Sequence, residues 1–197
     1  AVGDRVAYAS QQSGAYAQER LIAADRVVKI PDGVSDRLAA AAMLKGLTAH
    51  FLLRRTHRVR KGDTVVVHAA AGGVGLIAVQ WARALGAQVI GVVGSDAKAA
   101  VALVHGCHEA LVLGRDDLPG RVRSLTGGLG AHVVYDSVGK DTFVASLDSL
   151  RPLGMMVSYG NASGPVPPIA PVELARRGTL LLTRPTLFPY VARRAEL

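Results

Sequence analysis

The sequence predicts an α/β fold built on a doubly wound parallel sheet of six strands, and three observations lead to this prediction. Short runs rich in Val and Leu recur between residues 64 and 183, and they are apolar on nearly every residue. Such runs are typical of strands covered on both faces. Helical stretches separate the runs, so that strands and helices alternate. The first run leads directly into a glycine-rich turn and an apolar helix.

The predicted elements follow one another regularly along the chain. The strands cover residues 64–69, 88–93, 110–113, 132–138, 155–159 and 179–183. The helices cover residues 73–85, 97–105, 116–125, 141–150 and 172–177. This series is typical of a Rossmann domain, in which the crossovers between parallel strands are right-handed.

The first part of the chain has a different pattern. Weak alternation of apolar and polar residues predicts three short strands, at residues 2–8, 14–20 and 25–30. A turn signal follows at residues 31–33. Ser35 is expected to cap a helix that Gly46 ends, before a second helix at residues 47–55.

Composition limits the class of protein. The chain has 197 residues, of which 50% are hydrophobic and 19% charged, which suits one globular domain with a substantial core. No apolar run approaches the roughly 20 residues that span a bilayer. The single cysteine, Cys107, excludes an internal disulfide and a multi-cysteine zinc site, and we expect a reducing, cytoplasmic location. Because the chain begins at Ala1 and not at a methionine, we interpret it as a piece of a longer polypeptide.

The net charge of +8 does not by itself identify a partner. A basic balance is compatible with nucleic acid, an anionic membrane or a small anionic ligand. The basic residues are scattered except for one local cluster, which consists of Arg54, Arg55, Arg58, Arg60 and Lys61. This cluster is either the solvated end of a helix with its following loop or an anion-binding surface.

Residues 64–75 combine a strand, a glycine-rich turn and the start of a helix. Ala70, Gly72 and Gly75 occupy the positions of a G-x-G-x-x-G fingerprint, with alanine in place of the first glycine. Gly72 would let the backbone approach a pyrophosphate, and Gly75 would let the helix lie close to the strand. The free N–H groups at the start of the helix would face the phosphates. The turn therefore predicts dinucleotide binding, and the alternative is a glycine-rich turn that only packs.

The end of the second predicted strand bears on the choice of cofactor. Domains that prefer NAD usually place Asp or Glu there, whereas this strand ends at Gly94. Ser95 and Lys98 follow, and a hydroxyl and an ammonium group suit a 2′-phosphate. Lys98 could instead be an ordinary surface lysine, and Asp96 would favour NAD if its carboxylate reached the ribose. We predict NADPH as the cofactor.

Five motifs carry a resemblance to a known family. They are KGLTA at 45–49, HAAAGGVGLIAVQWA at 68–82, YDSVG at 135–139, GMMVSYGNASG at 154–164 and TRP at 183–185. Together they resemble the NADPH:quinone oxidoreductase (zeta-crystallin-like) branch of the zinc-free medium-chain dehydrogenase/reductase superfamily, over essentially the whole chain. The segment 68–75 alone would also fit enoyl reductases of the same superfamily.

The resemblance implies a domain organisation and an activity. Residues 1–31 would belong to a partial GroES-like catalytic domain, 32–185 to the Rossmann domain, and 186–197 to the return into the catalytic domain. The implied activity is NADPH-dependent hydride transfer to quinones or related α,β-unsaturated carbonyls, without a metal. Catalytic residues remain unassigned, because the nicotinamide supplies the hydride and the protein orients the two rings.

The resemblance also implies which residues contact the cofactor. They are Thr48, Gly72, Gly73, Val74, Gly75, Gly94, Ser95, Lys98, Arg115, Ser137, Val138, Tyr159, Gly160 and Asn161. The turn at 72–75 would meet the pyrophosphate, residues 94–98 the adenosine ribose and its 2′-phosphate, and Thr48 the nicotinamide. The remaining residues from 137 onwards follow the fourth and fifth strands, at the edge of the sheet where such folds bind ligands.

Two residues depart from the family pattern. Gly114 stands where relatives often carry a tyrosine near the adenosine, and Ala162 replaces a common serine. Both changes would weaken NADPH binding, and Arg115 is expected to compensate by meeting the phosphate.

The sequence contains other reactive side chains that could form a metal site or act as catalytic groups. His105 and His108 flank Cys107, but no second ligand cluster has a suitable spacing, so no metal site is predicted. Cys107 also lacks an oriented base that would make it a nucleophile. Tyr135 and Asp136 could exchange a proton, although Tyr135 alternates inward on its strand. We expect the proton to come from water or from outside this chain.

The expected partners are a small-molecule quinone or enone and a second copy of the protein. Residues 179–183 would form an outer strand that is very apolar, which predicts a twofold homodimer unless a missing segment covers the strand. A different class of function, an NADPH-linked single-stranded RNA-binding protein, stays open because of the basic charge. We expect the isolated chain to be poorly active, since most of the substrate-facing domain would lie outside it.

Overall fold

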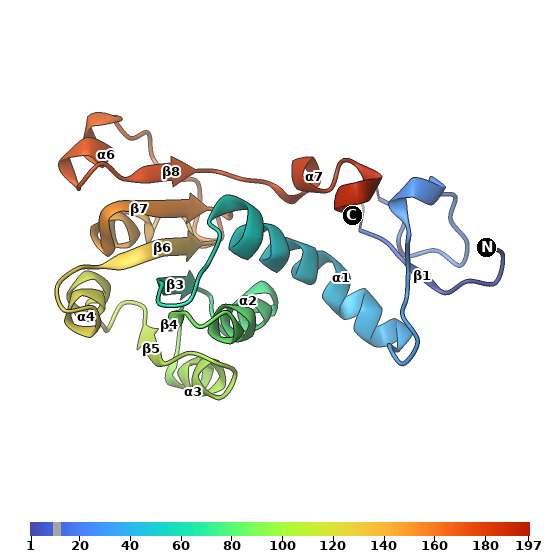
Figure 1. The fold of residues 1–197 in the computed structure, drawn as a ribbon, viewed down its shortest axis with the longest axis horizontal. Coiled ribbons are helices and arrows are strands. Elements are labelled where there is room, and N and C mark those ends of the chain that lie inside the picture. The colour runs from blue at the N-terminus through green and yellow to red at the C-terminus, as the bar shows by residue number, and fades with distance from the viewer. Residues whose placement is uncertain (10–12) are drawn as a thin grey trace. The chain divides into compact units, whose positions relative to one another are not determined.

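The computed structural model describes residues 1–9 and 13–197 (Figure 1). The chain forms two compact units. The smaller consists of Ala1–Thr48 and Thr186–Leu197, and the larger of Ala49–Pro185. The domain boundaries predicted at residues 31/32 and 185/186 stay a prediction about the whole protein.

The larger unit contains a six-stranded parallel sheet, which confirms the predicted fold class. The strands are β3 (Thr64–His68), β4 (Gln88–Val93), β5 (Glu109–Val112), β6 (Ala131–Asp136), β7 (Leu150–Ser158) and β8 (Leu181–Thr183). Their order across the sheet is β5-β4-β3-β6-β7-β8 (Figure 1). The winding direction reverses between β3 and β6, and ligands of open α/β sheets bind at such a reversal.

Helices cover both faces of this sheet. They are α2 (Gly73–Ala84), α3 (Asp96–Val104), α4 (Leu118–Leu125), α5 (Phe143–Asp148) and α6 (Val172–Arg176). Ile90 of β4 belongs to a buried cluster with Val122 of α4 and Leu147 of α5. The next residue, Gly91, points to the opposite face, where an added Cβ would lie 3.7 Å from the Cβ of Ala102 on α3. Burial on both faces explains why the strands are apolar at successive positions.

The helix break predicted at Gly46 is wrong. Helix α1 runs without interruption over Asp36–Phe51, and one π-helical turn, η2 (Leu52–Thr56), follows it. A glycine inside a helix costs only about 1 kcal/mol relative to alanine, and the alanines and leucines around Gly46 favour the helix enough to offset that cost.

The smaller unit has little regular structure besides the first part of α1. Strands β1 (Val6–Ala7) and β2 (Val28–Lys29) form an antiparallel pair, followed by two short C-terminal helices, α7 (Leu187–Tyr190) and η3 (Arg194–Glu196). The strand predicted at 14–20 is absent from this described segment, which forms bends. The 3₁₀ turn η1 (Ala24–Arg26) overlaps the start of the strand predicted at 25–30, and β2 forms only its later part. Side chains hold this region: the Arg20 guanidinium lies 4.9 Å from the centre of the Tyr8 ring.

Within the described residues, none of the helices combines the length and the apolar character needed to cross a membrane.

Candidate functional site

The turn between β3 and α2 is held by steric contact between backbone segments. Ala69, directly after β3, has a φ of 51°, and its carbonyl accepts a hydrogen bond from the Gly72 N–H at 2.8 Å. An added Cβ at Gly75 would collide with the Ala69 carbonyl and would lie 2.7 Å from the Ala70 carbonyl oxygen. Only glycine therefore lets α2 begin so close to the end of β3, as the fingerprint predicts.

A cavity of about 340 Å³ opens at the carboxyl ends of β3 and β4. Its lining residues are His68, Ala69, Ala71, Gly72, Val92, Val93, Gly94, Lys98, Leu113 and Val138. Of the residues implied as cofactor contacts, Gly72, Gly94, Lys98 and Val138 meet here, whereas Gly73, Val74 and Gly75 lie on the first turn of α2. Lys98 is the one positively charged residue among those that line the cavity, and the other lining residues are largely apolar.

The polar residues that follow β4 in the sequence are hydrogen-bonded to other groups of the protein. The Ser95 hydroxyl caps α3 by accepting a hydrogen bond from the Lys98 N–H at 3.4 Å. Arg115 donates from Nη1 to Asp96 Oδ1 at 2.7 Å and from Nε to Asp116 Oδ1 at 3.2 Å. Hydrogen bonds to Asp116 and Asp96 raise the pKa of Arg115. Asp96, the residue that would favour NAD, thus has its carboxylate bonded to a guanidinium.

The loops after β6 and β7 contact each other and bring together the predicted residues 137, 138 and 159–161. An added Cβ at Gly160 would lie 2.5 Å from the Ser137 carbonyl oxygen. The Ala162 N–H donates to the Ser137 carbonyl at 3.1 Å, and the Ser163 N–H donates to the Val138 carbonyl at 2.8 Å. Burial raises the pKa of Tyr159, so that its hydroxyl stays protonated.

Asn161 lines a different cavity of about 270 Å³, away from the glycine-rich turn. Its other lining residues are Phe143, Ser158, Pro165, Val166, Ile169, Leu182 and Arg184. The Ser158 hydroxyl is buried and has no hydrogen-bond partner within the described residues. Of the residues implied as cofactor contacts, Asn161 therefore lines this second cavity, whereas four others line the cavity beside the glycine-rich turn.

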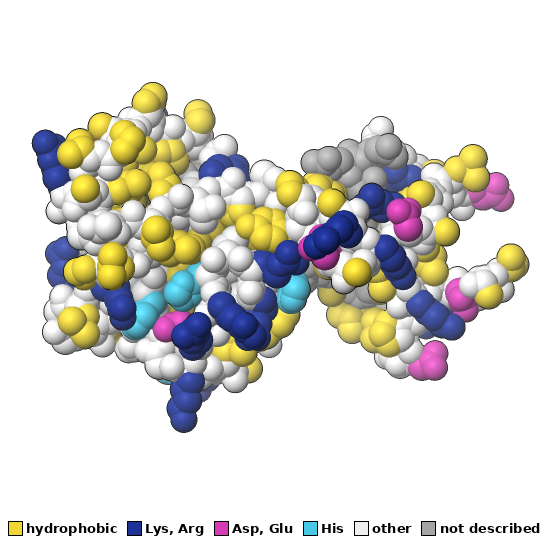
Figure 2. All heavy atoms as spheres, turned by 45° about the horizontal axis from the view of Figure 1, so that its top comes forward, with side chains coloured by type: hydrophobic (Ala, Val, Ile, Leu, Met, Phe, Trp, Pro, Cys, Tyr) yellow, Lys and Arg dark blue, Asp and Glu magenta, His cyan; other side chains and the backbone are white. Residues whose placement is uncertain are grey.

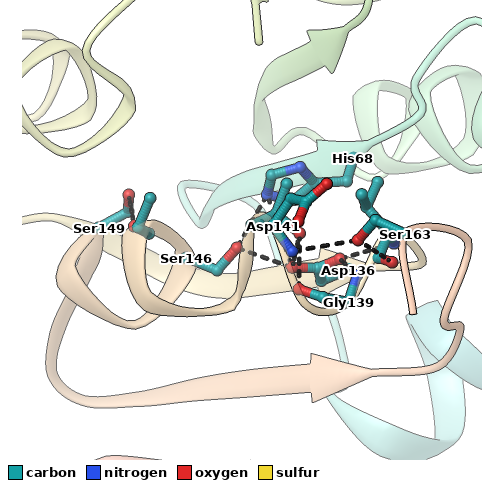
Figure 3. A network of polar contacts seen from close by, with 10 residues as sticks. His68, Asp136, Gly139, Asp141, Ser146, Ser149 and Ser163 are labelled. Atoms are coloured by element: carbon teal, nitrogen blue, oxygen red, sulfur yellow. Dashed lines mark hydrogen bonds and ion pairs between the residues drawn. The ribbon is translucent and has the colours of Figure 1, made fainter. Parts of the chain in front are cut away.

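A buried polar network lies between β3, β6 and α5, and sequence reasoning missed it (Figure 3). Asp136 Oδ2 accepts hydrogen bonds from Thr142 Oγ1 at 2.7 Å and from Ser146 Oγ at 2.9 Å. Ser146 Oγ also lies 2.9 Å from His68 Nε2. All four side chains are at most 1% exposed. Polar residues at the ends of two apolar strands, His68 and Asp136, were the available signal, but their adjacency depends on the strand order.

Burial argues against a catalytic role for Tyr135 and Asp136. The Tyr135 hydroxyl donates to the Leu52 carbonyl at 2.9 Å, and burial raises its pKa far above the ordinary value. Asp136 is fully buried and accepts four hydrogen bonds. Neither group can reach a substrate at the surface of the sheet.

Thr48 and Gly114 have local explanations. Thr48 belongs to the smaller unit, where its hydroxyl donates to the Leu44 carbonyl at 2.9 Å within α1. Gly114 follows β5 with a φ of 85°, in the left-handed region that bulky residues avoid. The backbone of this turn therefore favours glycine at the residue where the family resemblance implied a tyrosine.

Cys107 and its flanking histidines have structural contacts. Burial raises the pKa of the Cys107 thiol to about 11, which keeps it protonated and unreactive. His108 Nδ1 accepts from the Val89 N–H at 3.0 Å, and His105 Nδ1 lies 2.8 Å from the Val101 carbonyl oxygen. In residues 1–9 and 13–197, the structure brings together no group of three or more His, Cys, Asp or Glu side chains suited to a metal ion.

Basic side chains occur at several separate places on the larger unit in the face shown in Figure 2. Arg54 and Arg55 of the predicted basic cluster lie on the π-helical turn η2.

Comparison with known proteins finds related sequences and structures. The zinc-binding dehydrogenase family matches residues 73–193. A quinone oxidoreductase from Pseudomonas aeruginosa is 51% identical over 96% of this chain, and a 2-haloacrylate reductase from Burkholderia sp. is 50% identical over 100% of it. The structure of an Escherichia coli quinone oxidoreductase complexed with NADPH matches 98% of this chain with a TM-score of 0.94 and 47% identity.

The chain spans 58–60% of the length of these three relatives. The shared region includes the glycine-rich turn, the cavity and the sheet described above. The chain therefore belongs to the zinc-binding dehydrogenase family and, within it, to the quinone oxidoreductase branch of the medium-chain dehydrogenases and reductases.

Proposed function

We propose that the protein containing this chain is an NADPH-dependent oxidoreductase that transfers a hydride to quinones or related α,β-unsaturated carbonyl compounds. The observation that carries the proposal is the cavity beside the turn at residues 69–75. There Gly75 permits the close approach of α2 to β3, and Lys98 lines the same hollow. This combination suits a pyrophosphate at a helix N-terminus and a 2′-phosphate beside an ammonium group.

This chain would hold the cofactor through distinct groups. The turn and the first N–H groups of α2 would bind the pyrophosphate, and Lys98 would bind the 2′-phosphate. The loops after β6 and β7 would hold the nicotinamide half and orient its ring. The bound nicotinamide supplies the hydride, so the task of the protein is to align the rings and exclude water.

The substrate class rests on the relatives. Their names include quinone oxidoreductases and a 2-haloacrylate reductase at nearly the same identity to this chain. A quinone and a haloacrylate both contain a carbon–carbon double bond conjugated to a carbonyl group, which can accept a hydride. An enoyl reductase is the alternative within this chemistry. Rates of NADPH oxidation by the full-length protein with a benzoquinone, 2-chloroacrylate and an enoyl thioester would separate these choices.

Preference for NADPH over NADH is supported by the surroundings of Asp96. Lys98 lines the cavity, while the Asp96 carboxylate bonds to Arg115. A carboxylate engaged in this way accepts a ribose hydroxyl less readily and repels a phosphate less strongly.

The cofactor proposal is tested by calorimetric titration of the chain with NADPH and NADH, together with Lys98→Ala. We expect the wild type to prefer NADPH and the variant to lose about tenfold or more in NADPH affinity, with little change for NADH. Arg37→Ala, which removes an exposed positive charge on the first turn of α1, is the matched control. Equal affinities of the wild type for both cofactors would contradict the assignment.

We also propose a homodimer through the outer strand β8. Leu181 and Leu182 of this edge strand are 52% and 37% exposed, which is unusual for apolar side chains beside unpaired backbone groups. Pairing two copies of the strand would continue the sheet across a twofold axis. Light scattering on the full-length protein should give a dimer that Leu181→Lys dissociates, whereas Val144→Lys on α5 should not. A monomeric wild type would rule this interface out.

A further inference from the structure

We propose that the buried network of His68, Asp136, Thr142 and Ser146 positions the dinucleotide, because it fixes the spacing between the turn after β3 and the loop after β6. This inference rests on the proposed function. It assigns a positioning role to Asp136, Thr142 and Ser146, which do not line the cavity, and to their contact with His68, which does.

The network holds the loop after β6 at one end. Asp136 Oδ1 accepts hydrogen bonds from the backbone N–H groups of Val138 at 2.8 Å and Gly139 at 3.0 Å. Val138 lines the cavity at the strand ends, and Gly139 has a φ of 94°. The carboxylate therefore sets the backbone path of the loop that is proposed to receive the nicotinamide half of the cofactor.

The other carboxylate oxygen connects this loop to α5 and β3. Thr142 and Ser146 both approach Asp136 Oδ2, and Ser146 also contacts His68 Nε2 (Figure 3). The one Ser146 hydroxyl hydrogen goes to the carboxylate, which can only accept. His68 then donates its Nε2 hydrogen to Ser146 Oγ. Burial lowers the pKa of His68, which is consistent with this neutral ring.

The histidine lies directly before the glycine-rich turn. His68 is the last residue of β3, Ala69 is the first residue of the turn, and both line the cavity. His68 Nδ1 is buried and has no partner within the described residues, so the ring is held through its Nε2 contact. The chain of contacts thus joins the two loops that a single dinucleotide would bridge.

A purely structural role makes a different prediction. If the network only stabilised the fold, its loss would weaken every ligand in proportion. If it sets the spacing of the two loops, a ligand that spans both should suffer more than a fragment that binds mainly on the β3–β4 side. NADPH is such a spanning ligand, and adenosine 2′,5′-bisphosphate lacks the nicotinamide half.

The test uses Ser146→Ala, with Ser149→Ala as the matched control. Ser149 is also buried on the carboxyl-terminal side of α5, but its hydroxyl donates to the Ala145 carbonyl at 2.6 Å, outside the network. Calorimetry on each variant should show NADPH affinity falling about tenfold in Ser146→Ala, with the bisphosphate changed by less than about twofold. Ser149→Ala should change neither ligand by more than about twofold.

Hydrogen exchange provides a second measurement that does not depend on any ligand. The Val138 and Gly139 amides should exchange faster in Ser146→Ala, while the amides of β4 should keep their protection. Thr142→Val, which removes the other hydroxyl donor to Oδ2 at nearly constant volume, should reproduce both effects and serves if Ser146→Ala fails to fold.

The outcomes distinguish the two levels of inference. Equal losses for NADPH and the bisphosphate, or unchanged Val138 and Gly139 exchange, would overturn the positioning role and leave the cofactor assignment intact. Failure of the wild-type chain to bind either ligand would overturn the proposed function, and this inference with it.

Discussion

The two loops that border the cavity are held in place by different physical means. The turn after β3 is fixed by its shape: α2 lies so close to the carbonyls of Ala69 and Ala70 that a Cβ at Gly75 would have no room. The loop after β6 is fixed by a buried carboxylate, Asp136, which accepts two of its backbone N–H groups. The turn after β3 therefore tolerates no side chain at residue 75. The loop after β6 depends instead on the charge of Asp136 and on each hydrogen-bond partner in the buried network.

Of the substitutions that test this comparison, Gly75→Ala should have the largest effect on stability. The new Cβ would overlap two carbonyl groups, so α2 must move from β3, and we expect a loss of about 3 kcal/mol or more in the free energy of unfolding. Urea denaturation of the variant gives this quantity.

Gly46→Ala is the control for this substitution. An added Cβ at Gly46 meets no atom within 4 Å in the middle of α1, so this change should stabilise the protein by about 0.5–1 kcal/mol. Equal stability of the Gly75→Ala variant and the wild type would mean that the turn is not fixed by shape.

Asp136→Asn tests the loop after β6, which is held by hydrogen bonds to the Asp136 carboxylate. The asparagine keeps the volume but replaces one acceptor oxygen with an NH₂ group that faces N–H or O–H donors. We expect a loss of about 2–4 kcal/mol in the free energy of unfolding, because buried donors lose a charged acceptor. Asp141→Asn, at an exposed residue near the same helix, should change it by less than about 0.5 kcal/mol.

The pH dependence of stability sharpens the comparison, since the network that holds the loop after β6 includes a titrating side chain, His68. Burial holds the pKa of His68 below its ordinary 6.5, although Asp136 acts in the opposite direction. Between the folded and unfolded pKa values the unfolded chain binds more protons, so stability decreases as the pH falls below about 6.5. The slope for one such histidine is at most about 1.4 kcal/mol per pH unit.

Thermal unfolding of the wild type and His68→Gln from pH 5 to 8 measures this contribution. Burial lowers the pKa of His50 and His132 in the same direction, so part of the slope should remain in the variant. An identical slope in both proteins would show that His68 is not held neutral in the folded state.

We expect the smallest effect from Arg115→Met, because Arg115 is exposed and neither close packing nor burial strengthens its ion pairs. The substitution frees the Asp96 carboxylate, which should move the ratio of NADPH to NADH affinity toward NADH by a few-fold. The change should diminish in high salt, because exposed charges are screened. Arg121→Met, which breaks a similar exposed pair with Glu109, should leave the ratio unchanged.

Much of the sheet could be predicted because its signals are local. The residues of β4 were predicted at their observed bounds, 88–93, and those of β3 to within one residue, since continuous apolar runs identify doubly covered strands. Gly75 could also be recognised because its signal is local: its role depends on residues five and six positions away in the sequence. The break at Gly46 was predicted wrongly because a single glycine is a weak signal beside strong helix-forming neighbours.

Sequence by itself determined the order of the elements, the parallel sheet and the glycine-rich turn, since each depends on residues close together along the chain. Tertiary structure decided which polar groups meet. His68 and Asp136 are neighbours only because β3 pairs with β6, and Asp96 is bonded to Arg115 only because α3 and the turn after β5 lie side by side. Hydrogen bonds and ion pairs act over a few ångströms, so residues far apart in the sequence can form them only after the sheet has set the strand order.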